Sequence, residues 1–277
     1  MTVVEALGQA ITQLQAASDS PRADAEWLLA HATGRSRAQL LARPESVLAE
    51  VEHRVFAQAI TQRAQGVPVA YLLGEQGFWS LSLQVTPAVL IPRPETEGLV
   101  AWALEHLPVA HPVVLADLGT GSGAIALALA QERPLAEVHA VENSAAALAV
   151  ARANAQRLGL GGVRFVEADF LRWLASARGL DLIVSNPPYI AAGDAHLAAL
   201  RHEPAAALVA GPDGLACLRG LIAAAPLSLR RGGRLLLEHG YDQGPPVRAL
   251  LAAAGFRDIQ TRRDLAGHER LSGGTLA

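Results

Sequence analysis

The strongest constraint on the fold is a regular alternation of short apolar runs and longer helical patterns that starts near residue 112. Such alternation predicts an open, mostly parallel sheet with helices on both faces, whose ligands bind at the carboxyl ends of the strands. Strands are expected at 113–117, 137–142, 163–167, 180–185, 234–238, 256–261 and near 269–272. Helices are expected at 123–132, 144–158, 214–229 and 243–254.

The first 66 residues have a helical pattern instead. A first helix carries apolar residues at three- and four-residue steps, the period of one helix face. A second helix is expected from Ser20-Pro21 to Gly34, and a third over 45–65. Residues 1–66 are therefore predicted to form a small helical bundle. The recurring apolar residues of the first helix are Val4, Leu7, Ile11 and Leu14.

Residues 67–97 are expected to link this bundle to a sheet domain at 98–277. Tyr71-Leu72, Phe78-Trp79 and the alternating apolar residues of 81–85 predict a hairpin. Prolines then exclude regular structure before Glu95, and the next helix is expected at 96–107.

Charge and composition exclude several classes of protein. The net charge of −3, without a basic run, disfavours a direct nucleic-acid partner. Cys217 is the only cysteine, which excludes an internal disulfide, and the nine histidines lack zinc-site spacing, so no metal is predicted. Apolar runs such as Ile125–Ala130 are too short to span a bilayer. We expect a cytoplasmic protein that acts as a monomer, without a membrane partner.

A glycine-rich segment, Gly119-Thr120-Gly121-Ser122-Gly123, joins the strand at 113–117 to the next helix. Glycines there let the backbone turn tightly and approach a ligand at a helix N-terminus. A plain strand-to-helix turn is the simplest alternative, but three glycines in five positions disfavour it. A dinucleotide is one candidate ligand, because Gly119, Gly121 and Ala124 satisfy its fingerprint and Glu142 is placed for a ribose contact.

S-adenosylmethionine suits the same segment better. Asp117 would help hold its cationic methionyl end, with the backbone of Gly119–Gly123 against it. Glu142 would accept both ribose hydroxyls, since a carboxylate can accept two hydrogen bonds at once. Asp169 would bind the adenine amino group and Phe170 its ring, although Phe170 could instead be a core residue.

The second informative motif is Asn186-Pro187-Pro188-Tyr189, at the carboxyl end of the strand 180–185. Asn-Pro alone is a common turn signal. Together with the glycine loop, the four residues favour methylation of a planar amide or amino nitrogen, which is a poor nucleophile with two N–H donors. The Asn186 side chain and the Pro187 carbonyl can accept those N–H groups, and Tyr189 can stack on the plane.

These acceptors would stabilise the positive charge that builds on the nitrogen during transfer. We therefore predict Asn186, Pro187 and Tyr189 as catalytic residues and Asn186–Tyr189 as the substrate site, with direct in-line transfer. A nucleic-acid amino methyltransferase could use the same chemistry, but would need a basic groove and a recognition insertion. A non-catalytic cofactor-binding protein would have no use for an amide clamp.

Several motifs together resemble the release factor N(5)-glutamine methyltransferases of bacteria and organelles. The combination of LIPRPETE with NPPYI and LEHG is the most specific, and the resemblance covers nearly the whole chain. The motifs are PVAYLLG at 68–74, LIPRPETE at 90–97, DLGTGSGAIALALA at 117–130, NPPYI at 186–190, RHEP at 201–204, LLLEHG at 235–240 with Gln243, and the closing Asp264-Leu265-Ala266-Gly267 with Glu269-Arg270.

The resemblance implies a seven-stranded Rossmann-like methyltransferase sheet behind a helical N-terminal domain. The substrate would be the glutamine of the Gly-Gly-Gln loop in class I peptide chain release factors, docked with help from residues 1–66 and the IPRPETE segment. It also places cofactor contacts on Gly119–Gly123, Glu142, Phe170 and Asn186. The family usually has aspartate where this chain has Glu142.

Overall fold

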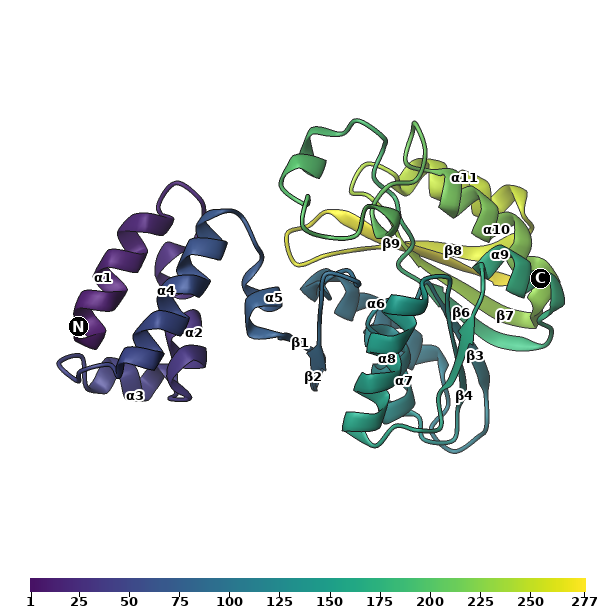
Figure 1. Ribbon diagram of the computed structural model, residues 1–277. Coiled ribbons are helices and arrows are strands. Elements are labelled where there is room, and N and C mark those ends of the chain that lie inside the picture. Colours follow the sequence, from purple (N-terminus) through teal and green to yellow (C-terminus); the bar gives the residue numbers. More distant parts are fainter. The chain divides into compact units, whose positions relative to one another are not determined.

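The computed structural model describes residues 1–277 (Figure 1) and divides into two compact units, Met1–Glu75 and Gln76–Ala277. The first unit is helical and encloses its own apolar core, to which Leu14, Leu28 and Phe56 belong. No helix of the chain is long and apolar enough to cross a membrane. The helices of the first unit are α1 (Val3–Leu14), α2 (Pro21–Thr33), α3 (Arg37–Ala42), α4 (Glu50–Ala64) and α5 (Val69–Leu73).

Two expectations for the first 75 residues were wrong. The helix expected over 45–65 is α4, and it starts at Glu50 rather than Glu45. The Glu52 carboxylate accepts from the Ala49 N–H and caps the helix there. Tyr71-Leu72 lies in α5, not in a hairpin. Pro68 and the left-handed Gly74 close this short helix at its two ends.

The hairpin itself is formed by β1 (Glu75–Phe78) and β2 (Leu81–Gln84). The next helix, α6 (Pro94–His106), includes a proline that was expected to lie outside regular structure. Pro94 is tolerated because it takes the first helical position, where a backbone N–H would have no partner within the helix.

A seven-stranded sheet forms the centre of the second unit, in the order β5-β4-β3-β6-β7-β9-β8. Strands β3 to β7 are parallel, whereas β9 is antiparallel to both of its neighbours. The chain builds outward from β3 to β5 and then returns to place β6 beside β3, which makes a topological switch point between these strands. The strands are β3 (Val114–Leu118), β4 (Glu137–Glu142), β5 (Arg164–Glu167), β6 (Leu180–Ser185), β7 (Leu229–Glu238), β8 (Phe256–Arg263) and β9 (Glu269–Leu276).

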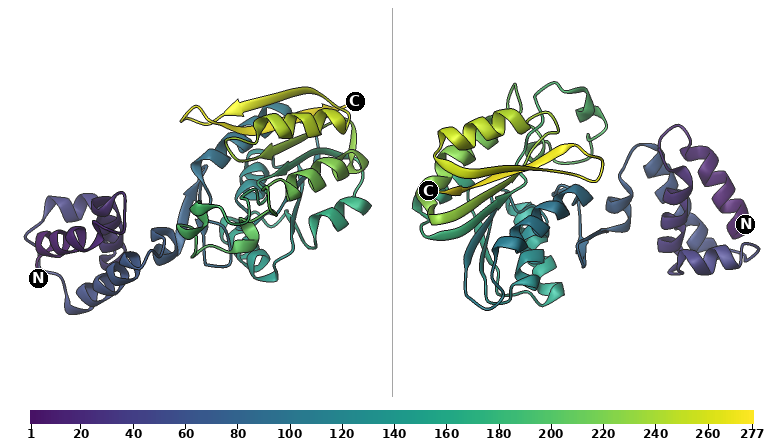
Figure 2. Two further views of the ribbon diagram at one scale, coloured as in Figure 1. Left: turned by 90° about the horizontal axis from the view of Figure 1, so that it is seen from above. Right: turned by 180° about the vertical axis from the view of Figure 1, so that it is seen from behind.

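Helices cover both faces of this sheet, as Figure 2 shows. Alternate residues of a strand point to opposite faces, so Leu115 joins one core cluster and Ala116 the other. The first cluster includes α6, α7 and α8, and the second α9, α10 and α11. These helices are α7 (Ala124–Glu132), α8 (Ala145–Leu158), α9 (Phe170–Ser176), α10 (Ala216–Ser228) and α11 (Gly244–Ala253).

The predicted α/β class is confirmed, with two differences in detail. The short helix α9 was not predicted, and its first turn is capped by Asp169, which accepts from the Arg172 N–H. Strand β7 starts at Leu229 rather than Arg234, because Leu229 pairs with Leu180 before a register shift in the ladder. Two short 3-10 turns, Ala195–Ala198 and Ala205–Ala207, lie between β6 and α10.

Candidate active site

The glycine loop, Gly119–Gly123, wraps the carboxyl end of β4. The N–H groups of Gly119 and Thr120 both donate to the Val141 carbonyl, at 2.9 and 3.1 Å. Gly119, Gly121 and Gly123 have φ values of 75°, 57° and 86°, a region that side chains rarely adopt. The glycines are therefore needed for the turn that the sequence predicted.

Asp117 supports this loop from beneath. Its side chain is completely buried, and Oδ2 accepts from Thr120 Oγ1 at 2.6 Å and from the Ala126 N–H at 3.1 Å. Its other oxygen, Oδ1, has no hydrogen-bond partner. Burial raises the pKa of Asp117 to about 7, because the charged form loses its hydration.

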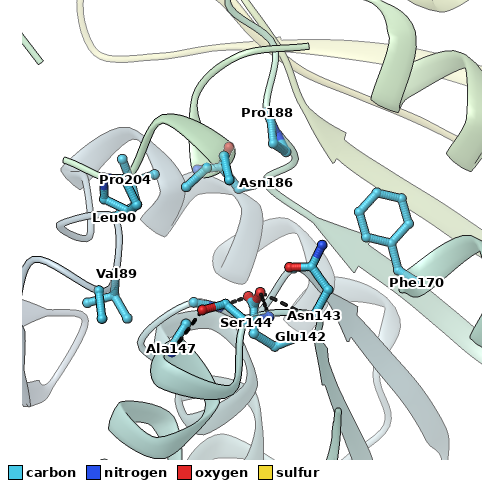
Figure 3. A pocket seen from close by; sticks show the side chains of 15 residues that line it. Val89, Leu90, Glu142, Asn143, Ser144, Ala147, Phe170, Asn186, Pro188 and Pro204 are labelled. Atoms are coloured by element: carbon cyan, nitrogen blue, oxygen red, sulfur yellow. Dashed lines mark hydrogen bonds between the residues drawn. The ribbon is translucent and has the colours of Figure 1, made fainter. Parts of the chain in front are cut away.

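Glu142 lies at the end of β4 and joins the loop to the following helix. Its Oε2 accepts from the Gly121 N–H at 3.0 Å, and its Oε1 accepts from the N–H groups of Asn143 and Ser144 at 2.9 and 3.0 Å. The carboxylate is partly exposed and lines a cleft at the switch point (Figure 3). It fixes the loop and remains available to a ligand.

This first cleft encloses about 720 Å³ of space, part of which is open to solvent. In Figure 3, Asn186 and Pro188 lie across the cleft from Glu142 and Ser144, and Phe170 lies across from Val89 and Leu90. The predicted site residues that line it are Gly119, Gly121, Glu142, Phe170, Asn186 and Pro188.

Other predicted cofactor residues do not line the first cleft. Thr120 and Ser122 are buried, and the Ser122 carbonyl accepts from Asn154 Nδ2 at 3.0 Å. Gly123 is the N-cap of α7, where an added Cβ would lie 3.0 Å from Leu127 and 3.3 Å from Ala151. Asp117 and Asp169 also lie off the cleft, the one beneath the loop and the other as the α9 cap. The structure gives these five residues roles in holding the loop and helices.

A second cleft lies on the other side of the NPPY loop, Asn186–Tyr189. It is lined by Asn186, Pro187 and Tyr189, together with Leu90, Arg93, Ile190, Leu200, Ala207 and Leu208. Asn186 lines both clefts, as Leu90 and Ala207 also do, so the two clefts meet at these residues. A group bound in one cleft can therefore meet a group bound in the other beside Asn186.

The NPPY loop is held by side chains from distant segments. Asn186 Nδ2 donates to Thr96 Oγ1 at 3.1 Å, and Tyr189 Oη donates to Glu238 Oε1 at 3.1 Å. The Tyr189 carbonyl accepts from Gln243 Nε2 at 3.0 Å. Sequence reasoning gave no role to these three supporting residues, although all lie in or beside the motifs LIPRPETE and LLLEHG.

The segment 90–93, which forms part of the cleft wall, is also held by a side chain from a distant segment. Glu203 is buried and accepts from the Ile91 N–H at 3.0 Å, and it also pairs with Arg93. Glu203 lies in RHEP and Arg93 in LIPRPETE, so two separated motifs meet here. Asn143 and Ser144 were also missed as lining residues, although their place directly after Glu142 is a signal that could have found them.

The chemistry that this arrangement permits is limited by its acceptors. The Oδ1 atom of Asn186 receives no hydrogen bond from the protein, because only Nδ2 is engaged. The prolines beside it have no N–H to offer. A planar group with N–H donors is thus the kind of ligand that fits next to Asn186.

Comparisons with known proteins agree with this description. Residues 5–74 match the family model "PrmC N-terminal domain", and residues 101–211 match "Methyltransferase small domain". Among solved structures, the T. Thermophilus 16S rRNA N2 G1207 methyltransferase in complex with AdoMet and guanosine has a TM-score of 0.53 at 21% identity, covering 73% of this chain and 50% of that one. A Pyrococcus furiosus methyltransferase gives 0.51 at 18%, covering 71% and 89%. Both support the fold alone.

Relatives in sequence are much closer. A protein named "Release factor glutamine methyltransferase" from Xylella fastidiosa (strain Temecula1) is 52% identical over 255 residues, covering 91% of this chain and 92% of that protein. Proteins of the same name from Coxiella burnetii and Escherichia coli K12 are each 46% identical to this chain. The Coxiella match covers 98% of both proteins, and the Escherichia match covers 96% of both. These matches confirm the resemblance found in the motifs: the chain belongs to the release factor glutamine methyltransferase family.

Proposed function

We propose that this methyltransferase transfers a methyl group from S-adenosylmethionine to the side-chain amide nitrogen of glutamine in the Gly-Gly-Gln loop of class I peptide chain release factors. The observation that carries the proposal is the position of Asn186 at the junction of two clefts. One cleft suits the cofactor and the other the glutamine side chain. The names of the relatives support a release factor as the substrate.

The residues of the first cleft fit S-adenosylmethionine. Glu142 would hold the ribose hydroxyls, Phe170 would contact the adenine, and the backbone of Gly119 and Gly121 would lie against the methionyl part. The unpartnered, buried Oδ1 of Asp117 beneath this loop would, in the ionised form of the carboxyl, add negative potential that suits the cationic end. When bound, the cofactor supplies an electrophilic methyl group on a sulfonium.

The NPPY loop would bind and orient the glutamine amide. Its two N–H groups would donate to Asn186 Oδ1 and to the Pro187 carbonyl, while Tyr189 packs against its plane. The positive charge that builds on the nitrogen lies next to two fixed acceptors, which stabilise it. The nitrogen itself is the nucleophile, so the transfer is a direct in-line displacement without a covalent enzyme intermediate.

The helical unit would dock the protein substrate. It has its own core, contributes no residue to either cleft and matches the family model "PrmC N-terminal domain". We assign it, together with the segment 91–97, to recognition of the release factor. The sheet unit then carries the transfer itself.

The proposal is tested by methyl transfer from labelled S-adenosylmethionine to a purified class I release factor. The matched control is the same factor with a Gln→Ala change in its Gly-Gly-Gln loop. We expect label on the natural factor and none on the control. Label on both factors would exclude this glutamine as the methylated site. Label only on added DNA or RNA would overturn the proposal that a release factor is the substrate.

A further inference from the structure

Three separated motifs meet in one buried hydrogen-bond network beneath the NPPY loop. Thr96 Oγ1, on α6, accepts from Asn186 Nδ2 at 3.1 Å and donates to Glu238 Oε2, at the end of β7, at 2.7 Å. The other Glu238 oxygen accepts from Tyr189 Oη at 3.1 Å. Thr96 and Glu238 are 4% and 2% exposed, so water does not compete for these contacts. The network therefore joins both polar side chains of the NPPY loop to a single carboxylate.

The direction of each hydrogen bond follows from the carboxylate. An ionised carboxylate only accepts, so Glu238 takes the hydroxyl proton of Thr96. The Thr96 oxygen is then left as an acceptor, and only the NH2 end of the Asn186 side chain can satisfy it. The opposite orientation would place the Asn186 oxygen against another oxygen without a proton between them.

We propose that Glu238 and Thr96 are positioning residues that fix the orientation of the Asn186 amide, with its oxygen toward the substrate and its NH2 group toward the protein. This inference rests on the proposed function, in which Asn186 Oδ1 accepts an N–H of the glutamine amide. A flipped Asn186 would present a donor to a donor, and the amide would not bind productively. Neither positioning residue lines the two clefts.

The charge state of Glu238 depends on its surroundings. Burial raises its pKa to about 6, whereas hydrogen bonds from Thr96 and Tyr189 and the charge of Arg270 on β9 lower it, and Glu95 on α6 raises it. Burial, followed by the Glu238 charge, raises the pKa of Tyr189 above its usual value, so Tyr189 stays a donor. Below pH 6 a protonated Glu238 can donate to Thr96, and the constraint on Asn186 is lost.

The first experiment compares Thr96→Val and Glu238→Gln with the matched control Thr96→Ser, which keeps the hydroxyl. We expect kcat to fall about 10- to 100-fold in the first two variants and to stay within about threefold of wild type in the control. The cofactor Kd should change by less than about threefold in all three. The wild-type kcat should fall below pH 6, and this acid limb should be absent in Glu238→Gln but present in Asp117→Asn.

The second experiment does not depend on turnover. The side-chain 15N–1H resonances of Asn186, identified by their absence in Asn186→Ala, should shift and exchange faster in Thr96→Val but not in Thr96→Ser. Unchanged resonances, a Thr96→Ser variant as impaired as Thr96→Val, or equal loss of cofactor binding would overturn the inference. Failure of the proposed function would look different, as a wild-type enzyme that leaves release factors unmethylated while the resonance shifts are still observed.

Discussion

The two sides of the first cleft are built in different ways. The glycine-loop side is held by partners closer in the chain, and its side-chain bonds from Gly121 to Glu142 and from Asn154 to Ser122 span 21 and 32 positions. The NPPY side depends on residues much farther away, with 90 positions between Asn186 and Thr96 and 49 between Tyr189 and Glu238. A local change can therefore be expected to disturb cofactor binding, whereas substrate orientation depends on the assembled fold.

The largest effect should come from Asn186→Ala, on the NPPY side. Loss of one fixed acceptor next to a developing charge should lower kcat about 100- to 1,000-fold. The cofactor Kd should stay within about threefold, because the glycine loop and Glu142 are untouched. Steady-state kinetics and calorimetric titration measure the two quantities. Equal losses in both would mean that the two sides are not separable.

The converse change is Glu142→Ala, on the glycine-loop side. It removes a charge-assisted contact and the acceptor for the Gly121 N–H, so the cofactor Kd should rise about 10- to 100-fold. At saturating cofactor, kcat should stay within about threefold of wild type. Titration with the cofactor and its demethylated product checks this. An unchanged Kd would remove Glu142 from the binding site.

A third variant, Gly214→Ala, tests the long-range support of the NPPY loop. A Cβ at Gly214 would lie 2.4 Å from the Tyr189 carbonyl oxygen, and the residue has a φ of +71°. The clash should cost about 1–3 kcal/mol of unfolding free energy and lower kcat, with the cofactor Kd kept. Gly179→Ala is the matched control, since its φ is +76° and nothing lies within 4 Å. Urea unfolding should show a smaller loss for the control, and equal losses would argue against a clash at Tyr189.

The last effect is a pH dependence of stability at Asp117. Its folded-state pKa of about 7 lies above the ordinary value of 3.8, so the folded protein binds this proton more tightly than the unfolded chain. The resulting stability is fully present below pH 3.8 and is lost as pH rises through 7. Asp117→Asn should therefore gain about 3 kcal/mol relative to wild type between pH 4.5 and pH 8. Urea unfolding of both proteins without cofactor measures this difference in unfolding free energy. A difference that stays constant from pH 4.5 to pH 8 would contradict the assignment.

The same contrast explains what could be read from the sequence. The glycine loop and the carboxyl end of β6 are continuous motifs, so Gly119, Glu142 and Asn186 were predicted to meet, and the structure places all three on one cleft. Thr96 and Glu238 were recognised only as parts of family motifs, because nothing local indicates that their segments converge. Sheet order decides that contact, by placing β7 next to β6.

Side-chain direction was the other limit. Asp117, Thr120 and Ser122 lie in the glycine motif, but their side chains are buried. The Thr120 hydroxyl donates to Asp117, and the Ser122 carbonyl accepts from Asn154 Nδ2. A motif gives residue types and spacing, whereas inward or outward direction depends on the positive φ values at the glycines between them. Their contact with the cofactor stays a prediction.

The separate cores of the two units have an evolutionary consequence. The cluster around Leu28 and Phe56 contains only residues of Met1–Glu75, and the clusters on the two sheet faces contain none of them. Substitutions in one core are therefore free of packing constraints from the other. The surface proposed to recognise the release factor can therefore change to follow its partner without disturbing the packing of the sheet unit.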